Sequence, residues 1–217
     1  YYITNPLTGG IINFDSLIKV IFSVILVVLW IIFMMNSMNW LDGIDGLSGG
    51  VAFIGAITIF ILSLKPEVNQ PPMAIISVIF AGATLGFLVF NFYPSRIMAG
   101  TSGATFMGFI LAVMAIFAGT KIATSILVLS LPGMDFVRVV WERWRNSRSL
   151  FEPDDRHLHY ALIRYGWSPR KIVWCIYSAT IFLAIVALNT GVIGKSVAFM
   201  VVCTVMIIFL FVTSKKS

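Results

Sequence analysis

The chain carries near its start the run Leu17-Ile-Lys-Val-Ile-Phe-Ser-Val-Ile-Leu-Val-Val-Leu-Trp-Ile-Ile-Phe-Met-Met35. Lys19 is the one charged residue in this run, and its length matches the roughly 17–25 apolar residues that cross a bilayer as an α-helix. A strand of a membrane β-barrel needs only about 9–11 residues and alternates apolar with polar positions, which this run does not. The run therefore predicts a transmembrane helix.

Further apolar runs follow the first, at residues 51–64, 74–92, 104–118, 122–137, 172–188 and 197–212. Over the whole chain 59% of the residues are hydrophobic and 11% are charged, whereas soluble domains are about half apolar and a quarter charged. We therefore expect an all-α fold, a polytopic transmembrane helical bundle with about seven spans. Residues 1–217 are expected to form a single membrane domain.

The basic residues predict the orientation of the bundle. If the connections alternate sides, one side carries eleven Lys and Arg residues and the other carries four. The eleven are Arg96, Arg138, Arg143, Arg145, Arg148, Arg156, Arg164, Arg170, Lys171, Lys215 and Lys216, and the four are Lys19, Lys65, Lys121 and Lys195. The richer side is cytoplasmic by the positive-inside rule, which places residues 36–50, 91–105 and 135–171 in the cytoplasm. The net charge of +6 reflects this asymmetry, so we expect a plasma-membrane protein with no nucleic-acid partner.

The beginning of the chain predicts that it is the C-terminal part of a longer protein. Residue 1 is Tyr instead of Met, and residues 1–14 lack the basic start and apolar core of a signal peptide. We therefore expect further spans and site residues upstream, without which this chain alone is inactive.

The first cytoplasmic segment follows directly on the first span and reads Asn36-Ser-Met-Asn-Trp-Leu-Asp-Gly-Ile-Asp-Gly-Leu-Ser-Gly-Gly50. Asn36, Asn39, Asp42 and Asp45 recur every three residues, so on a helical extension they form a polar stripe. Carboxylates near a membrane are costly unless they line water, pair or hold a ligand, which favours a functional role. The alternative is a loop whose Asn and Asp side chains merely cap two helices, but a cap needs one such residue.

The second segment, residues 91–105, places Arg96 before a Gly100-x-x-Gly103 turn that opens the next helix. Backbone N–H groups at such a helix start, with the hydroxyls of Thr101 and Ser102, could cradle a phosphate. An ordinary capped helix start after a proline turn explains the same pattern equally well.

The third segment, residues 135–171, begins with an amphipathic pattern. Val137, Val140, Trp141 and Trp144 fall at i, i+3, i+4 and i+7, while the arginines lie mostly elsewhere. This pattern indicates a helix at the head-group boundary, or more simply a basic anchor.

Both histidines of the chain, His157 and His159, lie later in this segment beside Arg156. Two histidines could bind zinc, but no Cys is available in the polar loops to complete such a site. A diphosphate fits better, because arginine binds phosphate bidentately and histidine can donate a hydrogen bond or proton to it.

Together these segments resemble the polyprenyl-phosphate N-acetylhexosamine-1-phosphate transferases of glycosyltransferase family 4, which initiate teichoic acid and O-antigen assembly and include the phospho-muramoyl-pentapeptide translocase. Asn36-x-x-Asn39-x-x-Asp42-Gly-Ile-Asp45-Gly-Leu47 is similar to the family's Asn-Ala-x-Asn-x-x-Asp-Gly-x-Asp-Gly-Leu. Asn91-Phe-x-Pro94, with Gly100-x-x-Gly103 and Phe106-x-Gly108, resembles a second motif. Pro153-Asp-x-Arg-His-Leu-His159 resembles the histidine loop of the teichoic acid and O-antigen branch.

The resemblance implies transfer of a sugar-1-phosphate, with N-acetylglucosamine favoured, from a UDP-sugar to polyprenyl phosphate. UMP is released and Mg²⁺ is the cofactor, and a homodimer stays open as a further partner. By position the resemblance assigns catalytic roles to Asp42, Asp45, His157 and His159, substrate binding to Asn36, Met98 and Arg156, and the metal to Asn39 and Thr101. Arg96 is added from its charge as a phosphate contact.

The chain departs from the family pattern in three places. Thr101 stands where the family has a metal-binding Asp, Met98 replaces an aromatic residue that stacks on uracil, and an upstream Asp-Asp pair is absent. A neutral hydroxyl is a weaker ligand for Mg²⁺, so either another carboxylate supplies the charge or the metal site is weakened. The alternative function is therefore a catalytically weakened homologue that binds nucleotide-sugar or lipid carrier in a complex. A transporter fits poorly, because the polar residues gather at helix ends.

Overall fold

The computed structural model describes residues 2–4, 11–13, 17–118, 122–145 and 157–214. Its helices are α1 Leu17–Leu41, α2 Leu47–Ser63, α3 Pro71–Asn91, α4 Gly100–Phe117, α5 Ile122–Val128, α6 Ser130–Arg145, α7 Leu158–Arg164, α8 Pro169–Asn189 and α9 Val192–Ser214. A small antiparallel pair, β1 Tyr2–Thr4 and β2 Ile11–Asn13, precedes them. Apart from this pair the expected all-α bundle is confirmed.

Helix starts and ends follow local chemistry. Pro71 and Pro169 occupy the first position of α3 and α8, where the missing N–H has no intrahelical partner to lose. The Ser168 hydroxyl caps α8 by accepting a hydrogen bond from the Lys171 amide.

Among the described residues, four helices are long and apolar enough to cross a membrane: Val20–Leu41, Pro71–Asn91, Gly100–Phe117 and Pro169–Asn189. Leu47–Ser63 and Ile193–Met206 are shorter apolar stretches of helix. The protein is therefore a multi-pass membrane protein, and six of the predicted runs coincide with a helix.

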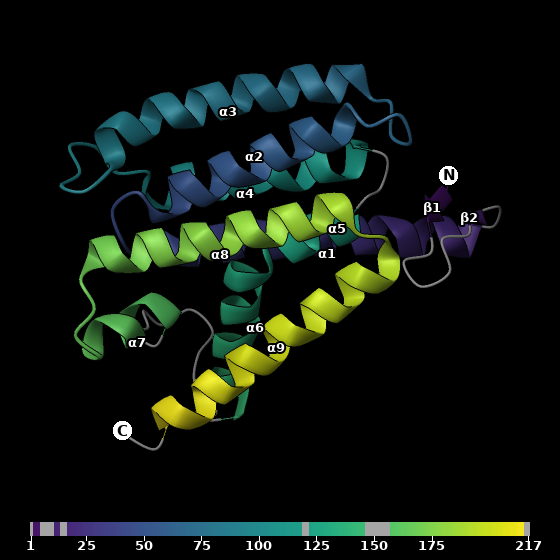
Figure 1. Ribbon diagram of the computed structural model, residues 1–217. Helices are drawn as coiled ribbons and strands as arrows, with labels where there is room; N and C mark the ends of the chain where they lie inside the picture. The colour runs from purple at the N-terminus through teal and green to yellow at the C-terminus, as the bar shows by residue number, and fades with distance from the viewer. Residues whose placement is uncertain (1, 5–10, 14–16, 119–121, 146–156, 215–217) are drawn as a thin grey trace.

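The predicted span at residues 122–137 is wrong as a single helix. The chain turns at Leu129, and α6 leaves the bundle at a steep angle to the long helices (Figure 1). Pro132 gives the reason, because in a continuous helix its ring would clash with the carbonyl of Val128. In the first turn of a new helix the same proline is tolerated.

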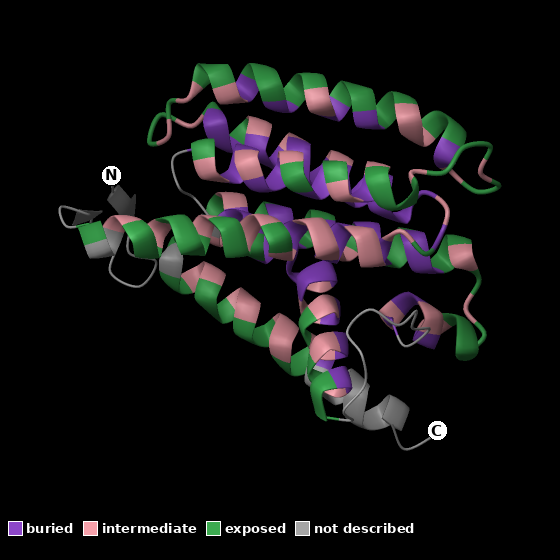
Figure 2. Ribbon diagram, turned by 180° about the vertical axis from the view of Figure 1, so that it is seen from behind, coloured by how far each residue is buried: buried purple, intermediate pink, exposed green. Residues whose placement is uncertain are grey.

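The long helices α1, α2, α3, α4 and α8 run side by side, and buried residues concentrate along α2 (Figures 1 and 2). Helices α1 and α4 approach closely, since a Cβ on Gly108 would lie 2.5 Å from the carbonyl oxygen of Met34. The Trp30 indole also donates a hydrogen bond to the Ala112 carbonyl across this contact. This packing brings the end of α1 and the starts of α2, α4 and α8 to one end of the bundle, beside α7.

The amphipathic pattern in the third segment is confirmed as a helical face of α6. Val137, Trp141 and Trp144 are exposed on it, while Asp135 and Arg143 are buried on the opposite side. The apolar face thus points away from the protein and the polar face points toward it.

Candidate active site

The first polar segment is only partly helical. Asn36 and Asn39 lie on the last turns of α1, whereas Asp42 and Asp45 lie in the turn that joins α1 to α2. The predicted helical stripe of four residues is therefore wrong beyond Leu41. The turn instead projects its two carboxylates toward different neighbours.

Asp45 joins the first polar segment to the second. Its two carboxylate oxygens accept hydrogen bonds from the Ser95 amide at 3.0 Å and the Ser95 hydroxyl at 2.9 Å. Buried Asn91 makes a second connection, accepting from the Gly46 amide at 3.0 Å and donating to the Ile97 carbonyl at 2.9 Å. The two segments therefore form one hydrogen-bonded unit.

Asp42 lies against the start of α4. The Ser48 hydroxyl donates to its carboxylate at 2.5 Å. Burial raises the pKa of Asp42 above its usual range, and the nearby Asp45 charge adds to the rise, while the Ser48 and Gly100 hydrogen bonds oppose it. A cation placed here would find a partly desolvated carboxylate beside a second one.

His159 brings the third polar segment to the same turn. Its side chain is 1% exposed and lies against Gly43, where a Cβ would overlap the His159 Nε2 atom. Burial lowers the pKa of His159 to about 4, so the ring is neutral near pH 7. Within the described part of the chain, Nε2 has no hydrogen-bond partner. A neutral imidazole nitrogen thus lies against Gly43, which stands between Asp42 and Asp45 in the sequence.

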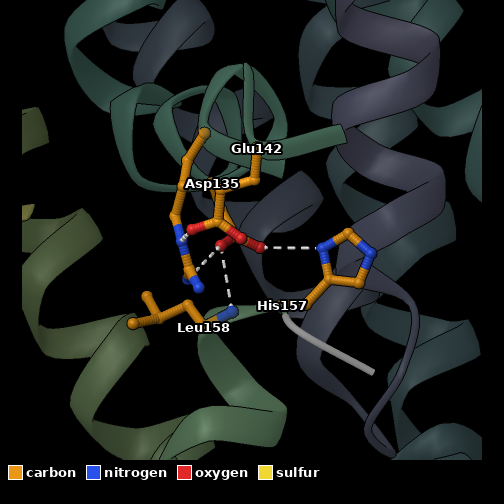
Figure 3. Close-up of polar contacts among 5 residues, drawn as sticks. Asp135, Glu142, His157 and Leu158 are labelled. Atoms are coloured by element: carbon orange, nitrogen blue, oxygen red, sulfur yellow. Dashed lines mark hydrogen bonds and ion pairs between the residues drawn. The ribbon is translucent and has the colours of Figure 1, made fainter. Parts of the chain in front are cut away.

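His157 lies beside His159, with parallel rings and centroids 5.7 Å apart. Its Nδ1 contacts Asp135 Oδ2 at 3.0 Å, and the amide of Leu158 donates to Asp135 Oδ1 at 2.9 Å (Figure 3). Trp40, near the end of α1, packs against the His157 ring and beneath the Arg143 guanidinium. The histidine loop is thereby fixed between α1 and α6.

The sequence prediction missed Asp135. It is 6% exposed and anchors His157 and Leu158, yet in the sequence it stands 22 residues before its partner within an amphipathic helix. The available signal in the sequence was an acidic residue on the side of the amphipathic helix opposite Trp141 and Trp144, the side that packs on the protein.

Other predicted site residues lie at the edge of this cluster. Arg96 and Thr101 are exposed, and Met98 is 75% exposed. The Asn36 amide donates to the carbonyl of Ile32 one turn earlier in α1. Arg156 lies outside the described residues. The structure therefore links Asp45 to Ser95, next to Arg96, and Asp42 to Gly100, next to Thr101, while His159 lies against Gly43 and His157 stacks beside His159.

The side chains around Asp42 offer few ligands for a metal ion. No three His, Cys, Asp or Glu side chains within the described ranges gather as a metal cluster. Mg²⁺ asks for less, since it keeps several waters and takes one or two carboxylates plus substrate phosphates. Asp42 meets the Gly100 amide, so Thr101 is close by, and Asn39 precedes Asp42 by one helical turn. One carboxylate with neutral oxygens fits a largely hydrated Mg²⁺ ion.

Known proteins resemble this chain in sequence. The family model of glycosyl transferase family 4 matches residues 3–119. The decaprenyl-phosphate N-acetylglucosaminephosphotransferase of Mycobacterium tuberculosis is 33% identical over 151 residues, covering 59% of this chain and 37% of that protein. The probable undecaprenyl-phosphate N-acetylglucosaminyl 1-phosphate transferase of Bacillus subtilis is 29% identical over 134 residues, with the same two shares.

A phospho-N-acetylmuramoyl-pentapeptide-transferase of Bacillus pumilus is 32% identical over 122 residues, covering 55% of this chain and 37% of that protein. The matches thus span little more than a third of each relative's length. The family model covers more than half of this chain, including the segments 36–50 and 91–105, and the chain therefore belongs to glycosyl transferase family 4.

Proposed function

We propose that the full-length protein transfers a sugar-1-phosphate from a UDP-sugar to polyprenyl phosphate, releasing UMP and initiating a cell-envelope glycan. The observation that carries the proposal is the meeting of three polar segments at one end of the bundle, with His159 against the Asp42–Asp45 turn. The names of the Mycobacterium and Bacillus relatives support N-acetylglucosamine-1-phosphate as the transferred group.

The reaction joins two anions, because the lipid phosphate must attack the β-phosphorus of the nucleotide-sugar. Positioning and electrostatic stabilisation carry most of such phosphoryl transfers. The Asp45–Ser95 and Asn91–Gly46 hydrogen bonds fix the turn relative to the start of α4, so they hold the binding surface in one shape. The two histidines lie on the third side of that surface, with His159 against Gly43 and His157 stacked beside it, where they are proposed to contact the substrate.

The proposed cofactor is Mg²⁺, held by Asp42 with Asn39 and Thr101 as neutral oxygen ligands. When bound, the ion supplies positive charge that lets the two phosphates approach. Asp42, which the family motif also contains, is then the one carboxylate proposed at the metal, because Thr101 stands where the family has a metal-binding Asp. Arg96 and Met98 complete the proposed substrate surface, and Arg156, which lies outside the described residues, is proposed from its charge as a further phosphate contact.

The proposed location is the plasma membrane, with the active site in the cytoplasm. The positive-inside rule supports this orientation, because the polar segments that form the site are rich in arginine. They contain Arg96, Arg138, Arg143, Arg164 and Arg170. UDP-sugars are charged and do not cross bilayers, so a cytoplasmic site meets its substrate directly.

The test is UMP release by the full-length membrane protein, supplied with polyprenyl phosphate, Mg²⁺ and a panel of UDP-sugars. We expect turnover with UDP-N-acetylglucosamine, lost on chelation of Mg²⁺, in inside-out vesicles and not in sealed right-side-out vesicles. Folded protein that turns over no UDP-sugar would overturn the proposal. Retained UDP-sugar binding in that case would identify the alternative, a catalytically weakened homologue.

A further inference from the structure

A buried carboxylate outside the family motifs holds the histidine loop in place. Asp135 extends from α6 and is 6% exposed, and both of its oxygens are engaged by residues at the start of α7. Oδ2 lies 3.0 Å from His157 Nδ1, and Oδ1 accepts from the Leu158 amide at 2.9 Å (Figure 3). One side chain thus fixes both the loop backbone and the imidazole ring.

Asp135 also pairs with an arginine of its own helix. The Arg138 guanidinium lies 3.5 Å from Oδ1 and is also paired with Glu142 at 3.1 Å. An ionised carboxylate can only accept, so the Asp135 contact requires His157 to carry its proton on Nδ1. The opposite ring nitrogen, Nε2, then carries the lone pair and points away from Asp135 (Figure 3).

Two aromatic side chains pack against the His157 ring. Trp40 lies on it with centroids 5.2 Å apart, and the His159 ring is stacked beside it. Trp40 also packs on Phe136, the residue after Asp135. A ring rotated to turn Nδ1 away would lose the Asp135 contact within this packing.

We propose that Asp135 is a positioning residue that fixes the tautomer and orientation of His157, so that the unprotonated His157 Nε2 accepts a hydrogen bond from a hydroxyl group of the substrate, on the sugar or on a protonated phosphate. Asp135 itself does not touch substrate. The inference rests on the proposed transferase function for the role of Nε2, whereas the Asp135–His157 relation stands on the geometry alone.

The sharpest variant is Asp135→Asn, because it preserves size and one oxygen. The Leu158 amide still needs an acceptor, so the asparagine oxygen stays on Leu158 and its NH₂ group turns to His157. His157 Nδ1 must then accept, and the proton moves to Nε2. Glu142→Gln is the matched control, since it removes a charge from the same helix without a contact to His157.

The first readout is the tautomer of His157 in the full-length protein, followed by ¹⁵N NMR at alkaline pH with the signal assigned by its loss in His157→Ala. We expect a protonated Nδ1 in the wild type and in Glu142→Gln, and a protonated Nε2 in Asp135→Asn. An unchanged tautomer in Asp135→Asn would overturn the proposal. This readout needs no turnover, so its failure is distinguishable from failure of the proposed function.

The second readout is UMP release. We expect Asp135→Asn to lower kcat by about 10–100-fold with KM changed less than about twofold, because it turns the acceptor Nε2 into a donor, and a positioned proton acceptor contributes on this order. Glu142→Gln should stay within about twofold of wild type. In a His157→Ala background, Asp135→Asn should cost less than about twofold more, since coupled residues are not additive. An equal cost with and without His157 would show that Asp135 acts on the fold alone, and would overturn the proposal.

Discussion

The contact between Gly43 and His159 determines how close the start of α7 comes to the Asp42–Asp45 turn. The His159 ring occupies the space that a side chain at position 43 would need, and both residues belong to segments named by the sequence motifs. This close approach explains why the turn needs glycine between two functional residues.

We predict that Gly43→Ala lowers UMP release by about tenfold or more, because the new methyl group pushes the His159 ring from the turn. The matched control is Gly86→Ala, which adds the same methyl on α3 where no atom lies within 4 Å. The control should keep full activity and gain up to about 1 kcal/mol of stability. Equal activity of the two variants in the UMP assay would show that the contact has no role.

Burial of neutral His159 makes the stability of the fold depend on pH. Its folded pKa of about 4 is below the ordinary value of 6.5, so the unfolded state binds more protons between these values. Stability is therefore complete above pH 6.5 and falls as the pH drops toward 4. The loss attributable to this group is about 2 kcal/mol at pH 5.

Denaturation in detergent at pH 8 and pH 5 measures this loss. We expect the wild type to lose about 2 kcal/mol more than His159→Gln over that range, because the variant lacks the titrating ring. Asp42, whose pKa is raised, contributes in the opposite direction and cancels in the difference. Identical pH dependence in both proteins would contradict a buried, neutral His159.

At the residue scale, the sequence predicted those site residues that lie in short, recognisable motifs. Asp42, Asp45, His157 and His159 belong to polar motifs next to apolar spans, and the structure brings these motifs to one end of the bundle. Asp135 was missed because its role depends on a partner 22 residues away. The catalytic and metal roles of these residues stay predictions.

At the scale of elements, one side-chain amide, that of Asn91, links the start of α2 to the end of α3 at the site. Asn91 ends α3 and bonds both the Gly46 amide before α2 and the Ile97 carbonyl before α4. One buried side chain thus gives a partner to the buried Gly46 amide and to the part-buried Ile97 carbonyl.

We predict that Asn91→Ala destabilises the protein by about 1–3 kcal/mol, because the Gly46 amide and the Ile97 carbonyl lose their partner. Asn189→Ala is the matched control, since the Asn189 amide bonds only a carbonyl of its own helix at the exposed end of α8. Unfolding in detergent should separate the two variants. Equal stabilities would show that the Asn91 bonds do not hold the segments together.

Helix boundaries were less predictable than helix existence. Apolar composition identified the spans, but it carried the predicted fifth span across Leu129, where Pro132 forces a new helix. Likewise the three-residue spacing of the first polar segment was extended past Leu41, although Gly43 and Gly46 favour a turn. In both places local backbone chemistry outweighed the pattern of the side chains.

At the scale of the whole molecule, the bundle works as a frame that gathers loops distant in the sequence. The end of α1, the segment after α3 and the start of α7 meet at one end because their helices pack side by side (Figure 1). Composition could predict a membrane bundle, but not which helix ends meet, since that depends on contacts such as Gly108 against Met34. The matched relatives are longer than this chain, so the transfer reaction is proposed for the full-length protein.

The most direct measurement follows radiolabel from UDP-N-acetylglucosamine labelled in the sugar into lipid, using full-length protein with polyprenyl phosphate and Mg²⁺. We predict one labelled lipid formed per UMP released, with Asp45→Asn reduced about tenfold or more and Glu67→Gln, in the loop that joins α2 to α3, unchanged. Folded wild-type protein that forms no labelled lipid from any UDP-sugar would contradict the proposed transfer.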